Sequence, residues 1–150
     1  MATRNGSATW TGDVRNGSGR LTVGNDGWNG DYGWSRFAGV LEPADERDTE
    51  TNPEELLAAA HAACFSMALS LALGEAGTPP ASIQTHARVH LRNIGGLPTI
   101  QEVDLETEGS VPGIDQRAFA EHAEQASTGC IISRALQGVE RINVTATLVP

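Results

Sequence analysis

Two cysteines, Cys64 and Cys130, are the residues of this 150-residue chain best suited to redox chemistry. Two thiols are too few for a disulfide-rich secreted scaffold, but they are the minimum for a redox pair. They stand 66 positions apart, so they form no local Cys-x-x-Cys motif, although they can still meet in space. The spacing therefore allows either a redox couple or two inert thiols.

Cys64 lies in an apolar segment, residues 56–73, whose exceptions are His61, Ser66 and Ser70. A free cysteine in such a segment is usually a small core residue, and apolar surroundings raise the pKa of a thiol. Chemistry at Cys64 therefore requires a positive group from elsewhere in the chain, and arginine is the natural candidate. Alanines at helical spacing from Cys64 leave room beside its sulfur.

Cys130 follows Gly129, and a short helix is expected to begin at Cys130 and to run to Leu136. The free backbone N–H groups at the start of a helix stabilise a thiolate. A capping position without chemistry is the alternative interpretation.

A long helix is expected to carry Cys64. Its start signals are a cap, a first-turn proline and two acids at the positive end: Asn52, Pro53, Glu54 and Glu55. Its end signals are Gly74, Gly77, Pro79 and Pro80. The apolar stretch reaches the lower length limit for a membrane span, but seven of its eighteen residues are alanine. This composition favours the buried central helix of a soluble protein, and no membrane association is expected.

The remaining segments predict strands and two further helices around this central helix. Expected strands cover residues 7–10, 20–23, 33–37, 83–91, 99–107 and 142–148. A polar loop is expected over 39–51, and a helix capped by Asp115 should bury Phe119, Ala123 and Ala126 before ending at Gly129. This order predicts an α+β fold with antiparallel sheets, formed by a single domain over residues 1–150.

The net charge of -9 argues against a nucleic-acid partner or an anionic membrane surface, because both carry negative charge themselves. The first twelve residues contain no signal-peptide pattern, so we expect a cytoplasmic protein. His86 and His90 share one strand face without a third ligand, so we expect neither a metal nor another cofactor.

Four segments together resemble the OsmC branch of the OsmC/Ohr family of osmotically inducible and organic-hydroperoxide-resistance proteins. They are the run from Asn52 to Leu69, the Trp-Ser-Arg-Phe segment around Arg36, the Val-Pro-Gly-Ile segment at 111–114, and Gly129-Cys130. The resemblance implies an OsmC-like fold built as an intertwined homodimer, with two active sites at the subunit interface. Two departures are Ile131, where the family usually has proline, and a longer acidic loop before Asn52.

The resemblance also implies a thiol peroxidase that reduces organic hydroperoxides, and hydrogen peroxide less well. Cys64 would attack the peroxide and become a sulfenic acid, and Cys130 would then form a disulfide with it. An external dithiol would reduce that disulfide, and the resemblance implies a lipoyl-type dithiol. Arg36 would activate Cys64, with Arg20 as its competitor for this role, and Glu54 would orient the guanidinium.

Trp34 and Phe37 are expected to line an apolar mouth for the substrate. His61 is expected to be a core or interface residue, since a thiolate that attacks peroxide needs charge stabilisation more than proton removal. A redox-responsive dimer that binds a hydrophobic ligand without turnover is the alternative function, and purely structural cysteines are a third interpretation.

Helix geometry constrains the pair Glu54 and Cys64. On one continuous helix, ten residues separate these side chains by ~15 Å along the axis and by nearly a right angle around it. Either the first turn leaves the helix, or a long arginine spans toward both, or Glu54 acts with a cysteine of the other subunit. The third arrangement is our working hypothesis.

Overall fold

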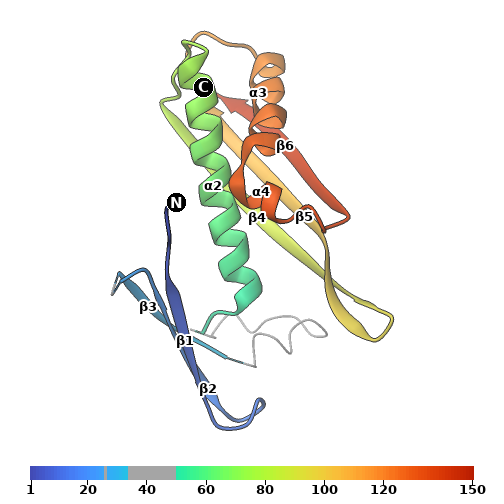
Figure 1. Cartoon of the computed structure of the whole chain (residues 1–150). Coiled ribbons are helices and arrows are strands. Elements are labelled where there is room, and N and C mark those ends of the chain that lie inside the picture. The colour runs from blue at the N-terminus through green and yellow to red at the C-terminus, as the bar shows by residue number, and fades with distance from the viewer. Residues whose placement is uncertain (26, 34–49) are drawn as a thin grey trace. The chain divides into compact units, whose positions relative to one another are not determined.

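The computed structural model describes residues 1–25, 27–33 and 50–150. The described chain forms two compact units, Met1–Leu56 and Leu57–Pro150. The expected polar loop lies outside the described residues except at its last two positions, 50 and 51. Figure 1 labels the elements along the chain.

The first unit contains a three-stranded antiparallel sheet in the order β1-β2-β3. Its strands are β1 (Gly6–Thr11), β2 (Ser18–Val23) and β3 (Trp28–Tyr32). The first two agree with the sequence expectation, but the third strand lies upstream of the expected segment 33–37, and residues 34–37 are not described. The earlier start follows from a tight connection after Val23, which pairs directly with Trp28.

The second unit contains a three-stranded sheet in the order β4-β5-β6. Its strands are β4 (Ser82–Ile94), β5 (Leu97–Ser110) and β6 (Arg141–Val149). The β4 and β5 strands pair antiparallel, as expected for a hairpin, whereas β5 and β6 pair parallel. The expectation of purely antiparallel sheets was therefore wrong for this pair. Two helices lie between β5 and β6 in sequence, and such a crossover is what a parallel pairing requires.

The long helix α2 (Pro53–Glu75) begins where the start signals place it. The Asn52 side chain accepts a hydrogen bond of 2.7 Å from the Glu55 backbone N–H, which confirms the expected cap. One face of α2 is buried in the described chain, through His61, Phe65, Leu69 and Leu73. The expected central core helix is thus confirmed, although in the single chain it is buried on one face alone, and Met67 and Leu71 remain 68% and 63% exposed. By length and composition α2 would also suit a membrane span, but its buried face forms part of a soluble core.

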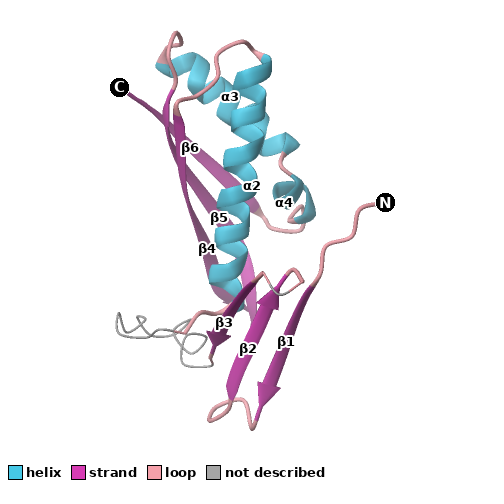
Figure 2. Ribbon diagram, turned by 90° about the vertical axis from the view of Figure 1, so that its left-hand side faces the viewer, coloured by secondary structure: helices cyan, strands magenta, loops and turns pink. Residues whose placement is uncertain are grey.

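Helix α3 (Gln116–Gly129) completes this core together with the short helix α4 (Ile131–Ala135). Asp115 caps α3 with a 2.8 Å hydrogen bond from the Ala118 backbone N–H, as predicted. Figure 2 shows α2 and α3 on the same face of the β4-β5-β6 sheet. The residues packed between these layers include Phe65, Leu69, Leu73, Leu105, Phe119, Ala123, Ala126 and Cys130. This core contains the three α3 residues that the sequence predicted to point inward.

Candidate active site

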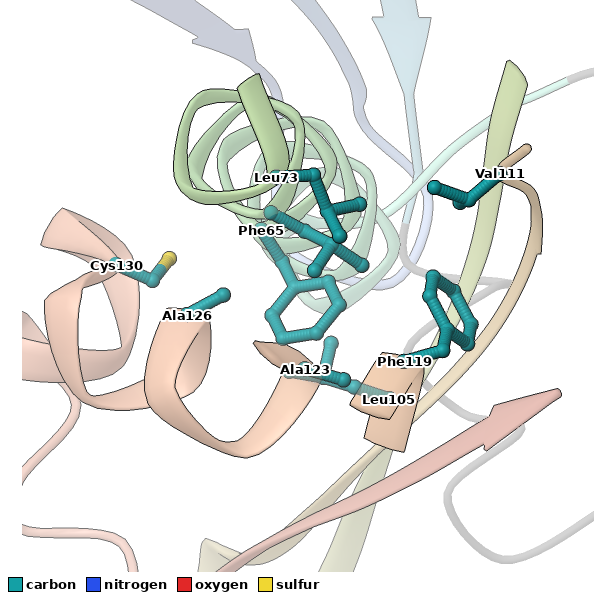
Figure 3. Packing of buried hydrophobic residues seen from close by; sticks show 9 residues of the cluster. Phe65, Leu73, Leu105, Val111, Phe119, Ala123, Ala126 and Cys130 are labelled. Carbon is teal, nitrogen blue, oxygen red and sulfur yellow. The ribbon is translucent and has the colours of Figure 1, made fainter. Parts of the chain in front are cut away.

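The structure brings the two cysteines together within the second unit. Cys64 lies at the middle of α2 and is partly exposed, whereas Cys130 precedes α4 and is buried. Both are free thiols, and the Cys64 side chain lies near enough to that of Cys130 to lower the pKa of the Cys130 thiol. Figure 3 shows Cys130 at the edge of the hydrophobic cluster with its sulfur directed toward α2. The tertiary fold therefore shows that the two thiols, 66 positions apart in sequence, do meet in space.

Cys130 occupies the N-cap position of α4, as the sequence indicated. Burial raises the pKa of its thiol, but four contacts together act more strongly in the opposite direction. They are the Ser133 backbone N–H, the Cys64 side chain, the Ser133 hydroxyl and the Ile132 backbone N–H. The pKa of Cys130 consequently lies below its ordinary value of 9.0. The sulfur makes no capping hydrogen bond of ordinary geometry, so the helix N–H groups act on it electrostatically.

The two thiols differ in solvent exposure. Cys130 exposes 1% of its surface, so a peroxide in solution cannot reach its sulfur directly. Cys64 is the more exposed of the pair and touches both the core and the solvent side of α2. The geometry is therefore that of an outer thiol that can meet a substrate and an inner thiol that can reach only its partner.

A buried polar pair, His61 and Ser133, lies near Cys130. His61 on α2 is fully buried, and its Nε2 lies 2.8 Å from the Oγ of Ser133 on α4. Burial lowers the pKa of His61, so its imidazole is neutral at pH 7. Among the described residues its Nδ1 has no hydrogen-bond partner. His61 is thus a core residue, as expected, but it is only half satisfied by hydrogen bonds.

Glu54 lies in the first turn of α2, which runs without interruption from Pro53 to Glu75. Of the three arrangements considered for Glu54 and Cys64, the one in which the first turn leaves the helix is therefore wrong. Direct contact within one chain is also ruled out, because ten helical residues span ~15 Å. A bridging arginine and a cysteine of another subunit remain as the two alternatives.

Arg20 on β2 pairs with Asp31, the residue directly opposite on β3, at 3.1 Å. Both side chains are about two-thirds exposed (66% and 64%), so this ion pair lies in water. Arg36, Trp34 and Phe37 lie outside the described residues. The described chain thus places Arg20 in a surface ion pair and leaves the role of Arg36 as an expectation.

A contacting pair of free cysteines, one of them at the start of a helix, within an α+β fold is typical of two-cysteine redox proteins. The chain belongs to the OsmC family: the sequence profile of the OsmC-like protein family matches residues 45–145. It is 43% identical to the Peroxiredoxin OsmC of Escherichia coli (strain K12) over 136 residues, which cover 89% of this chain and 90% of that protein.

Solved structures agree with this assignment. An OsmC like protein from Mycoplasma pneumoniae superimposes with a TM-score of 0.77 over 99% of both chains at 18% identity, which supports the fold alone. An organic hydroperoxide resistance protein from Elizabethkingia anophelis gives a TM-score of 0.71 at 28% identity, covering 99% of this chain and 96% of that one. The OsmC-like fold expected from the sequence is therefore confirmed.

Ser133 is the residue near the thiols that sequence reasoning missed. It stands three positions after the N-cap cysteine, where a side chain of a helix lies beside its cap. This spacing was a usable signal, but no local pattern connects Ser133 with His61, which is 72 positions earlier.

Proposed function

We propose that this protein is a cysteine-dependent peroxidase that reduces organic hydroperoxides to alcohols. The observation that carries the proposal is the contact between an accessible thiol and a buried thiol of lowered pKa, in a chain of the OsmC family. The relatives named peroxiredoxin and organic hydroperoxide resistance protein support the same reaction class.

Cys64 is the proposed peroxidatic residue. Its thiolate attacks one peroxide oxygen, the O–O bond breaks, and the alkoxide that leaves takes up a proton to become the alcohol. The sulfur is thereby oxidised to a sulfenic acid. Its greater exposure, compared with that of Cys130, supports this assignment.

Arg36 and Glu54 are the proposed activating pair. A guanidinium beside Cys64 would favour its thiolate and hold the peroxide oxygens, and a carboxylate would fix the guanidinium by paired hydrogen bonds. The exposed ion pair of Arg20 with Asp31 supports Arg36 over Arg20 for this role. Trp34 and Phe37, neighbours of Arg36 in sequence, are proposed to line the apolar mouth.

Cys130 is the proposed resolving residue. Its sulfur attacks the sulfur of the Cys64 sulfenic acid, the S–O bond breaks, and water leaves as the disulfide forms. The existing contact between the two side chains supports a reaction that needs little movement. An external dithiol, proposed to be of the lipoyl type, then exchanges with the disulfide and restores both thiols.

A homodimer is the proposed active form. The exposed apolar stripe of α2, which contains Met67 and Leu71, supports a partner surface, since large apolar side chains gathered on one helix face favour association. Such a partner would also allow Glu54 of one subunit to act with Cys64 of the other. We further propose that the protein works in the cytoplasm.

Peroxide consumption in the presence of a dithiol tests the proposal. Wild type should consume cumene hydroperoxide faster than hydrogen peroxide, Cys64→Ser should lose turnover, and Cys130→Ser should complete one oxidation without forming a disulfide. Turnover by Cys64→Ser would contradict the peroxidatic assignment. Oxidation of both thiols without any peroxide turnover in wild type would favour the ligand-binding alternative instead.

A further inference from the structure

The buried contact between His61 and Ser133 lies next to the proposed resolving cysteine, and the proposed mechanism so far assigns it no role. His61 Nε2 and Ser133 Oγ are 2.8 Å apart, and both residues are buried, with 0% and 7% of their surfaces exposed. The pair joins α2, which carries Cys64, to α4, which begins after Cys130. Hydrogen bonding to Ser133 thus places an imidazole close to the inner thiol.

Ser133 connects the imidazole to the sulfur. It is the third residue of α4, and Cys130 is the N-cap, so the Ser133 hydroxyl and backbone N–H lie beside the Cys130 sulfur. The order of groups is therefore His61 Nε2, Ser133 Oγ, Cys130 Sγ and Cys64. A hydroxyl is both a donor and an acceptor, so this chain can carry a proton in either direction.

We propose that Ser133 and His61 remove the proton of Cys130 when it resolves the Cys64 sulfenic acid. This inference rests on the proposed peroxidase function and assigns a route for one of its protons. Ser133 contacts the reacting sulfur, and His61 acts through Ser133 as the proton acceptor.

The proposed step balances in atoms and charge. The Cys130 thiol proton passes to Ser133 Oγ while the Ser133 hydroxyl proton passes to His61 Nε2. The Cys130 sulfur forms the S–S bond, the S–O bond of the Cys64 sulfenic acid breaks, and the oxygen leaves as hydroxide. Hydroxide takes up a solvent proton and the His61 imidazolium releases one, so the products are the disulfide and water.

Burial prepares His61 for this task because it keeps the imidazole neutral and its lone pair available. The Nδ1 of His61 also favours the neutral form, because among the described residues no acceptor lies beside it to stabilise an imidazolium. The protonated ring therefore readily releases its proton. Before the transfer Ser133 donates to Nε2; after it, Nε2–H donates to Ser133, whose hydroxyl then donates to the thiolate. The hydrogen bonds before and after the transfer thus join the same atoms, with donor and acceptor exchanged.

Single-turnover oxidation of the full-length reduced protein by one equivalent of cumene hydroperoxide tests the proposal. The sulfenic acid at Cys64 is trapped with a 1,3-dicarbonyl reagent, and disulfide formation is followed by mass spectrometry. In Ser133→Ala and His61→Gln, oxidation of Cys64 should keep its wild-type rate, while disulfide formation slows roughly 100-fold, the low end for loss of general-base catalysis. The sulfenic acid should accumulate.

Glutamine distinguishes a proton acceptor from a structural contact, because its amide can hydrogen-bond with Ser133 but cannot take up a proton. Wild-type disulfide formation in His61→Gln would overturn the proposal. Ser133→Thr retains the hydroxyl and should restore the rate that Ser133→Ala loses.

Matched controls remove other hydroxyl and imidazole groups. Ser66→Ala deletes the α2 hydroxyl that donates to Thr85 at 2.8 Å, and His122→Gln replaces the other described histidine with a buried, unpartnered Nδ1. Both should form the disulfide at the wild-type rate. Equal slowing in these controls would overturn the relay.

A solvent isotope measurement on wild type keeps the test independent of folding in the variants. Disulfide formation should be slower in deuterium oxide, whereas an unchanged rate would overturn proton transfer in that step. Failure of the proposed function has a different signature: no peroxide consumption and no sulfenic acid in wild type, whatever the behaviour of His61 and Ser133.

Discussion

At the level of single residues, the two thiols differ in solvent exposure and in the electrostatic environment of their sulfur atoms. Cys130 has the lowered pKa but is buried, and Cys64 is accessible. A low pKa alone would thus have selected the inner cysteine as the one that meets peroxide. The greater exposure of Cys64 supports the proposed opposite assignment, in which an arginine supplies the activating charge.

Replacement of the two candidate arginines separates their roles. Arg36→Ala should lower kcat/KM for cumene hydroperoxide by roughly 10- to 150-fold, since a charge-assisted hydrogen bond contributes roughly 1.5–3 kcal/mol. Arg20→Ala breaks only an exposed ion pair with Asp31, which stabilises a fold by about 0–1 kcal/mol. Steady-state kinetics with each variant provides the measurement, and a greater loss in Arg20→Ala than in Arg36→Ala would reverse the assignment.

Burial of His61 also predicts how stability depends on pH. Its pKa is lowered from 6.5 in the folded protein, so below pH 6.5 the unfolded chain binds more protons at this site than the folded chain. The free energy of unfolding should therefore be constant, for this site, above that pH and fall as the pH decreases below it. Denaturant unfolding between pH 7.5 and pH 5.5, a range chosen around the ordinary histidine pKa of about 6.5, provides the measurement.

Two carboxylates titrate below this window and should not interfere. Asn143 and His90 lower the pKa of Asp104 from 3.8, and Arg88 lowers that of Glu106 from 4.5. His61→Gln should flatten the pH dependence, whereas His86→Gln, which replaces an exposed histidine, should retain it. Identical slopes in the two variants would contradict the contribution of His61.

At the level of elements, close packing between α3 and β5 holds the helix whose C-terminal end leads into Cys130. Gly109 on β5 faces the ring of Phe119, and a Cβ at this position would clash with the ring atoms. Glycine is needed here for close approach, because both residues are buried. The same contact holds α3, whose end positions Cys130.

Gly109→Ala should therefore destabilise the protein by about 1–3 kcal/mol, the usual cost of overpacking a core. Gly74→Ala is the matched control, since its Cβ meets open space at the end of α2. This control should be neutral or stabilising by about 0.5–1 kcal/mol, because alanine favours a helix over glycine. Urea unfolding of both variants measures the difference, and equal stabilities would show that the Phe119 ring yields without cost.

At the level of the whole molecule, α2 presents an apolar face that the described chain leaves uncovered. Met67 and Leu71 stand four positions apart on this face, and Ile131 beside Cys130 is 73% exposed. A helix that is apolar all round normally buries both faces, so the second face is proposed to meet another subunit. Ile131 occupies the first position of α4, where the proline usual in the family would also fit.

Leu71→Glu should convert the proposed dimer to monomers, because a carboxylate in an apolar interface loses its hydration. Leu97→Glu makes the same change at a leucine that is 70% exposed in the β4–β5 hairpin and should leave the dimer intact. Light scattering at matched concentrations measures the mass of each. If Glu54 acts across the interface, monomeric Leu71→Glu should also lose peroxidase activity; a monomeric wild type would contradict the proposal.

Sequence alone determined the local structure of this protein. The caps at Asn52 and Asp115, the inward face of α3 and the helix start at Cys130 all depend on neighbours within a few residues, which is why they could be predicted. Only the tertiary structure decided that Cys64 touches Cys130, that His61 meets Ser133 and that β6 pairs parallel with β5. These contacts join segments far apart in the chain, and packing of α2 and α3 on one sheet face selects them.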